Sequence, residues 1–172
     1  MFRGDQHLTI DAKGRMAIPT KYRETLLERY DGKLVVTADP ESCLLLFTLQ
    51  DWEEFERNLL KAQKEKQLPR LKKLKRFYIG QATELEMDGN GRILLPSTLR
   101  KFAGLDKKIV MCGQGDRFEI WNEQDWNEQL NDDMDEHYKE MVGHLYTYAW
   151  MGSWIDVKGK FQRHGGDRVF AL

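Results

Sequence analysis

Two stretches of the chain match each other and predict two copies of one structural unit. Residues 11–23 align with residues 88–100, and five of the 13 aligned pairs are identical. The identical pairs are Asp11/Asp88, Gly14/Gly91, Arg15/Arg92, Pro19/Pro96 and Arg23/Arg100. A second block follows in the same order, where residues 47–54 parallel residues 121–128. Two matching blocks in one order indicate an internal duplication.

Each copy predicts the same succession of short elements. An alternating strand leads into a tight turn at residues 11–14 or 88–91, because Asp can bond the backbone two residues on and Gly supplies a positive φ. A return strand follows, and Pro19 or Pro96 then ends it at the start of a short helix. Two apolar strands complete the copy, with a closing helix whose capping box we place at Asp51 or Asp125.

The two copies are expected to share one fold. Each has only about four short strands and cannot bury its own sheet face. We therefore expect an α+β domain in which the copies pair around a pseudo-twofold axis into one β-barrel with peripheral helices. The expected boundaries are 5–68 for the first unit, 69–81 for a connecting helix that starts after a break at Pro69, and 82–140 for the second unit. Residues 141–172 form a C-terminal extension of different composition, to which we assign no function.

Charge is balanced in total but uneven along the chain. The sequence has 27 Lys and Arg against 28 Asp and Glu. Residues 57–76 contain nine basic residues and one acid, whereas residues 119–140 contain nine acids and one lysine. One interpretation is two solvated helix faces. The other is a dipolar protomer that associates head to tail with its own copies and keeps a basic surface for a polyanion.

Composition argues against a membrane or secreted protein. The longest uninterrupted apolar run is residues 43–47, whereas a membrane span needs roughly 20 such residues. The first residues show no apolar signal region, so we expect a cytoplasmic protein. Cys43 and Cys112 lie in apolar stretches without a Cys-x-x-Cys partner, which predicts reduced core thiols.

We find no sequence signature of catalysis and expect neither an enzyme nor a small-molecule substrate, cofactor or metal. The histidines lack a His-x-x-x-His motif or a ligand set at metal spacing, and His137 and His144 are interpreted as a solvated pair. The Gly113-Gln114-Gly115 segment is flanked by strands and indicates a hairpin, because a phosphate-binding loop needs a helix after it.

The opening Met-Phe-Arg-Gly, the Asp-x-x-x-Arg at 11–15 and its repetition at 88–92 resemble the bacterial MraZ family. More broadly, the chain is similar to SpoVT-AbrB swapped-hairpin proteins over roughly residues 1–140. The resemblance implies a sequence-specific, nucleoid-associated DNA-binding regulator of the division and cell-wall gene cluster. It also implies a ring-shaped homo-oligomer that binds double-stranded DNA at short G-rich direct repeats upstream of its own operon, and it favours repression over activation.

Under this resemblance the turns carry the DNA-binding residues. The strand parity that buries Met16 and Ile18 exposes Arg15, and arginine can pair bidentately with the guanine edge in the major groove. Lys13 suits a phosphate contact, and Asn90 replaces it in the second turn, so we expect the first turn to contribute more. The candidate DNA-binding residues are Arg15, Lys13, Arg3 and Arg92, and the turn-forming residues are Asp11, Gly14, Asp88 and Gly91.

Four alternatives stay open from the sequence. Arg15 and Arg92 could instead pair with Asp11 and Asp88 and brace the turns, and Arg3 could be a mobile terminal arginine. An AbrB-like antitoxin or protein-interaction module without operator binding would share the fold. RNA binding is not excluded by charge, although the sequence has no RRM-like aromatic motif.

Overall fold

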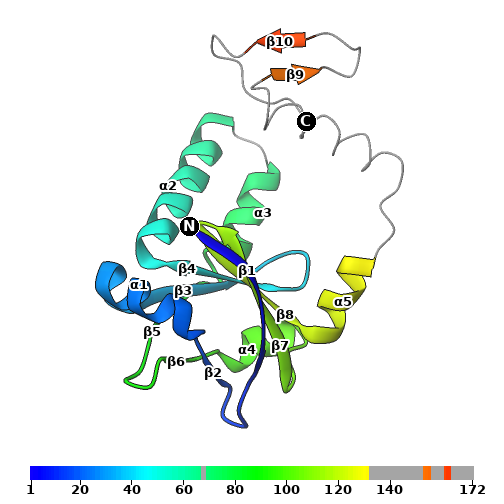
Figure 1. Ribbon diagram of the computed structural model, residues 1–172. Helices are drawn as coiled ribbons and strands as arrows, with labels where there is room; N and C mark the ends of the chain where they lie inside the picture. Colours follow the sequence, from blue (N-terminus) through cyan, green and yellow to red (C-terminus); the bar gives the residue numbers. More distant parts are fainter. Residues whose placement is uncertain (67–68, 132–152, 156–160, 164–172) are drawn as a thin grey trace. The chain divides into compact units, whose positions relative to one another are not determined.

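The structure is a computed structural model that describes residues 1–66, 69–131, 153–155 and 161–163, and it divides into two compact units (Figure 1). The first unit spans Met1–Leu130 and the second Asn131–Leu172. In the second unit the described residues form an antiparallel pair, β9 (Ser153–Ile155) and β10 (Phe161–Arg163). Several residues named in the sequence analysis lie outside the described residues. They are the predominantly acidic segment 132–140, His137, His144, His164 and, apart from β9 and β10, the extension from residue 141 onward.

Both copies contain the succession of elements that the repeat predicts. The first copy comprises β1 (Phe2–Thr9), β2 (Arg15–Ala17), α1 (Thr20–Tyr30), β3 (Lys33–Ala38), β4 (Leu44–Thr48) and α2 (Leu49–Lys66). Helix α3 (Pro69–Tyr78) connects the copies, with proline at its first position, where no N–H is needed. The second copy comprises β5 (Thr83–Glu86), β6 (Arg92–Leu94), α4 (Ser97–Phe102), β7 (Lys108–Gly115), β8 (Arg117–Asn122) and α5 (Glu123–Asn131).

Strands of the two copies interleave in one antiparallel sheet of order β1-β7-β8-β4-β3-β5. Strand β1 of the first copy pairs with β7 of the second, and its counterpart β5 pairs with β3. The two copies also meet through β4 with β8, and through the separate pair of β2 with β6. Each pairing between copies therefore has its counterpart when the copies are exchanged.

The hydrogen-bonded ladder is open and does not close into the expected barrel. Strands β1 and β5 are the two edges of the six-stranded sheet, and β2 with β6 forms its own two-stranded sheet. Strands β2 and β6 are three residues long, and in the described residues a single isolated bridge, between Ile10 and Met16, links β2 back toward β1. Because Pro19 and Pro96 follow so closely, these return strands end before they can complete a continuous ladder.

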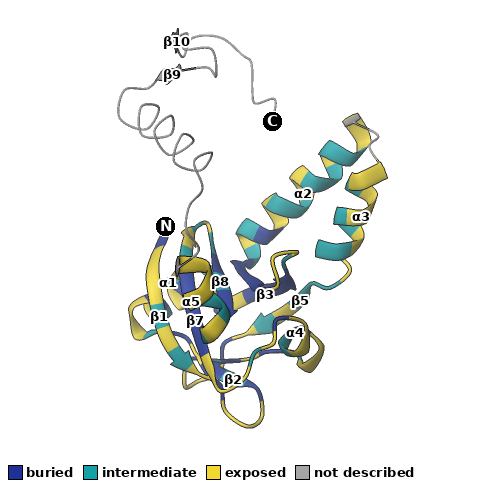
Figure 2. Cartoon of the chain, turned by 90° about the vertical axis from the view of Figure 1, so that its right-hand side faces the viewer, coloured by how far each residue is buried: buried dark blue, intermediate teal, exposed yellow. Residues whose placement is uncertain are grey.

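Strands β3 and β4 are buried on both faces, apart from Lys33 at the start of β3, and Figure 2 shows β3 in the colour of buried residues. One face packs Val36 and Leu46 against α1, α4 and the β2–β6 pair in the larger core cluster. The opposite face packs Val35 and Phe47 against Trp52 of α2, with further aromatic side chains from α3 and α5 at the margin. Helices α2 and α3 extend away from the end of the unit that carries the loop between β1 and β2 (Figures 1 and 2).

The closing helices begin earlier than the sequence predicts. The Thr48 hydroxyl accepts a hydrogen bond from the Asp51 N–H at 3.1 Å and donates to the Asp51 carboxylate at 2.7 Å, so Thr48 is the capping residue of α2. In the second copy the Asn122 side chain accepts from the N–H groups of Gln124 and Asp125. The caps are thus the last residues of β4 and β8, and Asp51 and Asp125 lie in the first helical turn, where acids are favourable.

The two cysteines are free and buried, as expected. Burial is the main reason that the pKa of each thiol lies above its ordinary value. Among the helices described in the structure, none is both long enough and apolar enough to span a bilayer.

Candidate nucleic-acid interface

The turn between β1 and β2 is organised by the carboxylate of Asp11. One carboxylate oxygen accepts hydrogen bonds from the backbone N–H groups of Lys13, at 3.0 Å, and Arg15, at 2.9 Å. The other oxygen accepts from Nε of Arg15 at 2.7 Å. Gly14 has φ +89° and donates its N–H to the Asp11 carbonyl, which closes the turn. Each residue of the Asp-x-x-Gly-Arg motif therefore has a role in this one turn.

The turn between β5 and β6 repeats this geometry. The Asp88 carboxylate accepts from the N–H groups of Asn90 and Arg92, at 2.8 Å and 2.9 Å, and from Nε of Arg92 at 2.9 Å. Gly91 has φ +71° and donates to the Asp88 carbonyl. The turn-forming roles expected for Asp11, Gly14, Asp88 and Gly91 thus correspond to the hydrogen bonds of both loops.

Arg15 and Arg92 make the bracing ion pairs that the sequence left open. Each arginine side chain is 33% exposed in its pair and so remains partly in contact with solvent. The bond to the aspartate uses Nε, one of the five N–H donors of an arginine. Bracing therefore fixes the guanidinium at the surface without occupying all of its donors. The expected parity also holds, because Met16 and Ile18 are buried and Ala17 is exposed.

The other two candidates lie at different distances from the first turn. Lys13 is exposed at the turn itself, beside Arg15. Arg3 is exposed near the far end of β1, about 20 Å from the turn at roughly 3.3 Å per strand residue. Its backbone is held by pairing with Gln114 and by a hydrogen bond from the Tyr22 hydroxyl to its carbonyl. The structure therefore groups Lys13 with Arg15 and places Arg3 elsewhere.

Two arginines that the sequence did not assign to the site contact the turns. Arg100 donates from Nε to the Leu95 carbonyl at 3.0 Å, and its guanidinium lies against Gly14 of the other copy. Arg23 donates to the Ile18 carbonyl at 2.6 Å and lies in the same way against Gly91. The available signal was that these arginines are the last identical pair of the repeat.

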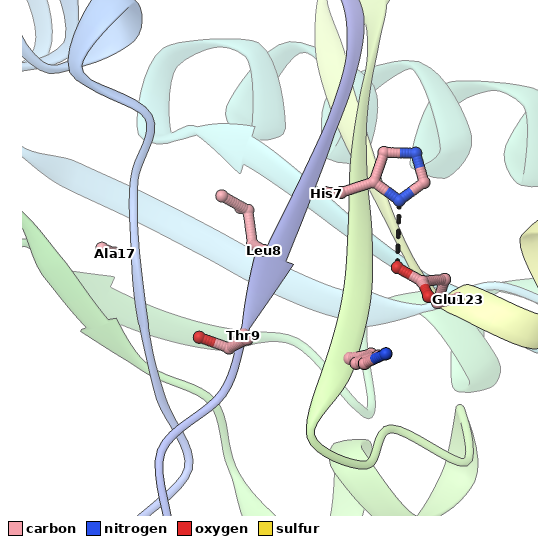
Figure 3. Close-up of a pocket in the computed structure, with 6 residues that line it drawn as sticks. His7, Leu8, Thr9, Ala17 and Glu123 are labelled. Atoms are coloured by element: carbon pink, nitrogen blue, oxygen red, sulfur yellow. Dashed lines mark hydrogen bonds and ion pairs between the residues drawn. The ribbon is translucent and has the colours of Figure 1, made fainter.

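A depression of about 400 Å³ lies beside the end of β1. Figure 3 shows His7 turned toward Glu123, with Nδ1 and Oε2 3.0 Å apart, while Leu8 and Thr9 come from β1 and Ala17 from β2. Within the described part of the chain, no group of three or more His, Cys, Asp or Glu side chains is arranged to hold a metal ion. What this depression offers chemically is one His–carboxylate pair with Lys108 nearby.

The double variant Asp11→Asn/Asp88→Asn lacks both turn carboxylates. It is expected to lose a pH-dependent part of the free energy of unfolding. The pKa of each carboxyl lies below its ordinary value of 3.8, chiefly because the backbone N–H of Arg15 or Arg92 donates to it. Since the folded-state pKa is lowered, the stabilisation is present above the ordinary value and is lost as pH falls through the folded-state pKa.

Urea unfolding of both proteins at a series of pH values checks this prediction. The difference in the free energy of unfolding between the native chain and the variant should stay constant from about pH 7 to 5 and narrow below about pH 4. A difference in the free energy of unfolding that stays constant, or grows, below about pH 4 contradicts the prediction.

Comparison with known proteins gives one consistent match. A family model described as "MraZ protein, putative antitoxin-like" matches residues 1–75 and 78–143. A protein of Alkalilimnicola ehrlichii named transcriptional regulator MraZ is 50% identical over 143 residues, which cover 83% of this chain and 94% of that protein. Proteins of the same name from Methylococcus capsulatus and Shewanella baltica are 51% and 47% identical, over 74% and 77% of this chain and 82% and 86% of their own lengths.

Proposed function

The chain belongs to the MraZ family, and from that premise we propose that it is a transcriptional regulator that binds specific double-stranded DNA through the turn between β1 and β2. The observation that carries the proposal is the braced Asp11–Arg15 turn, which holds a guanidinium in a fixed position at the surface. Arginine in this setting can form a bidentate pair with the O6 and N7 atoms of guanine. The proposed sites are short G-rich direct repeats upstream of the protein's own operon, in the division and cell-wall gene cluster, and the proposed effect is repression.

The residues around the turn have two proposed roles, which are base recognition and positioning on the duplex. Arg15 reads bases, whereas Lys13, exposed in the same turn, contacts a phosphate and fixes the register on the duplex. Arg92 presents a similar guanidinium, but Asn90 beside it carries no charge, so the second turn binds DNA more weakly. Arg3 makes an outlying phosphate contact, because its place on β1 puts it too far away to share a base pair with Arg15.

The matched strand pairings support a pseudo-twofold, swapped-hairpin arrangement of the two units. Its proposed boundaries are residues 5–68 and 82–140, with residues 69–81 as the connection. In the described residues, β1 with β7 corresponds to β5 with β3, and both β2–β6 and β4–β8 join equivalent strands. In this arrangement the β2–β6 pair joins the two return strands, so both turns belong to one structural unit.

Charge supports self-association into a ring. Exposed cations are spaced along α2 and α3. They are Arg57, Lys61, Lys64, Arg70, Lys72, Lys73 and Arg76. Helix α5 begins with Glu123 and Asp125, and its last described turn contains no basic residue. A basic surface on one copy and an acidic helix on the next favour head-to-tail contact. A ring that repeats the same turn can engage successive direct repeats, raising avidity by about 10²–10⁴-fold.

DNA binding by the assembled protein tests the proposal. A labelled duplex from upstream of its own gene and a shuffled duplex of equal composition are titrated at two salt concentrations. We expect tighter binding to the upstream duplex, by roughly 10³-fold or more, and a steep loss of affinity with salt as phosphate contacts release counterions. Equal binding to both duplexes, or none, by correctly assembled protein would reject operator recognition and favour the antitoxin-like or protein-interaction function.

A further inference from the structure

The guanidinium of Arg100 occupies the space that a side chain on Gly14 would need. A Cβ atom built on Gly14 would lie 2.5 Å from Cζ and 2.6 Å from Nε of Arg100. Arg100 is anchored in its own copy by the bond from Nε to the Leu95 carbonyl, and the Leu95 N–H donates to the Gly14 carbonyl at 3.0 Å. The guanidinium of an arginine anchored in the second copy therefore packs against the first turn.

The same contact occurs with the copies exchanged. A Cβ atom built on Gly91 would lie 2.5 Å from Nε and 2.6 Å from Cδ of Arg23. Arg23 is anchored to the Ile18 carbonyl, and the Ile18 N–H donates to the Gly91 carbonyl at 2.8 Å. Two independent instances of one geometry make a chance contact a poor explanation.

From these contacts we infer that Arg100 and Arg23 are positioning residues that act across the duplication: Arg100 holds the Asp11–Arg15 turn, and Arg23 holds the Asp88–Arg92 turn. Gly14 precedes Arg15 directly, so a shift of the Gly14 backbone moves the guanidinium that we propose reads the DNA. Base readout needs geometry held within about 0.5 Å, and the packed guanidinium of Arg100 adds a restraint from the second copy to the hydrogen bonds that Asp11 makes within the turn. This inference rests on the proposed function for its effect on DNA, but the positioning itself is a property of the free protein.

The test compares Arg100→Ala with Arg23→Ala, which serves as its matched control. Both changes remove one half-buried arginine and one hydrogen bond to the carbonyl that directly follows a return strand. If the first turn dominates DNA binding, the ratio of operator affinity to shuffled-DNA affinity should fall by about 5- to 150-fold in Arg100→Ala, the range for losing one bidentate base contact, and much less in Arg23→Ala. A purely structural role would give both variants the same loss.

Arg100→Lys separates positioning from a direct phosphate contact. Lysine keeps the positive charge but has no planar group to lie against Gly14. We expect Arg100→Lys to retain most of its affinity for shuffled DNA while losing the operator preference. Full recovery of the preference by lysine contradicts the inference. This variant also keeps the test decisive if Arg100→Ala fails to fold.

Amide hydrogen exchange tests the coupling without DNA. Arg100→Ala should accelerate exchange at the Gly14 and Arg15 amides and leave the Gly91 and Arg92 amides unchanged, and Arg23→Ala should show the reverse. Unchanged exchange at the Gly14 and Arg15 amides in Arg100→Ala, or equal acceleration at both turns in either variant, overturns the inference. If the native protein binds no operator but exchange shows the crossed pattern, the proposed function fails and the positioning stands.

Discussion

Replacing Phe118 by Ala is expected to lower the free energy of unfolding by about 3–5 kcal/mol. Phe118, on β8, is 1% exposed, and its ring centroid lies 4.3 Å from that of Phe2 on β1 and 4.9 Å from that of Tyr22 on α1. One side chain of the second copy thus packs against two elements of the first. Its removal forfeits the burial of an aromatic ring and leaves a cavity that the paired strands cannot collapse to fill.

Equilibrium unfolding in urea measures this loss, with Phe102→Ala as the matched control. Phe102 has the same side chain but is 37% exposed at the end of α4, so the identical deletion should cost far less. A loss of about 3–5 kcal/mol is a large fraction of the 5–15 kcal/mol typical of a domain, so Phe118→Ala should unfold at a much lower urea concentration. Equal losses in the two variants would contradict the packing that links the copies.

The local structure of each copy could be predicted well, because the sequence signals for turns and strands lie within a few residues of one another. Asp11 and Gly14 have the side-chain hydrogen bonding and the positive φ that the turn needs, and both are visible in the sequence. The return strand, with Met16 buried and Ala17 exposed, follows from alternation alone. These features depend on residues within a few positions of one another.

Partners distant in the sequence could not be predicted in the same way. Nothing in the alternation of β1 indicates that it pairs with β7, and the closed barrel was expected because unpaired edges are unfavourable. In the structure, three-residue return strands stop the ladder, and β1 and β5 remain its edges. The contact of Arg100 with Gly14 depends on the same long-range pairing. The sequence therefore shows that Arg100 is a repeated residue but does not show that it contacts Gly14.

The start of α2 has two candidate capping residues, three positions apart. Asp51 is a good capping residue, but Thr48 also offers an oxygen, at the end of a buried strand. The strand fixes the position of Thr48, and the helix therefore begins there. Propensity alone does not rank two such candidates three residues apart.

Arg15→Ala is expected to abolish the preference of the protein for its operator. Each protomer would lose one bidentate base contact, worth roughly 1–3 kcal/mol, and a ring that engages several repeats loses that contact at each of them. Affinity for shuffled DNA should fall much less, because the proposed phosphate contacts, such as that of Lys13, would remain. Arg92→Ala is the matched control, since it removes the same ion pair from the equivalent turn.

Binding of the native protein, Arg15→Ala and Arg92→Ala to both duplexes, measured by fluorescence anisotropy, gives the six affinities needed. Sedimentation of each variant confirms that assembly is unchanged. An equal loss of operator preference in Arg15→Ala and Arg92→Ala would contradict the assignment of the first turn as the principal reader. An Arg15→Ala protein that keeps its operator preference would remove Arg15 from the interface.

The most direct measurement replaces the guanines of the operator repeats, one at a time, by 7-deazaguanine, which pairs normally with cytosine but lacks the N7 acceptor. We predict that at one guanine of each repeat this change, which removes one of the two acceptors of a bidentate pair worth roughly 1–3 kcal/mol, weakens binding of the native protein by about 5-fold or more and does not weaken binding of Arg15→Ala. Such a result would place the Arg15 guanidinium on that base. Equal weakening of the native protein and Arg15→Ala at every guanine would show that Arg15 does not read the operator.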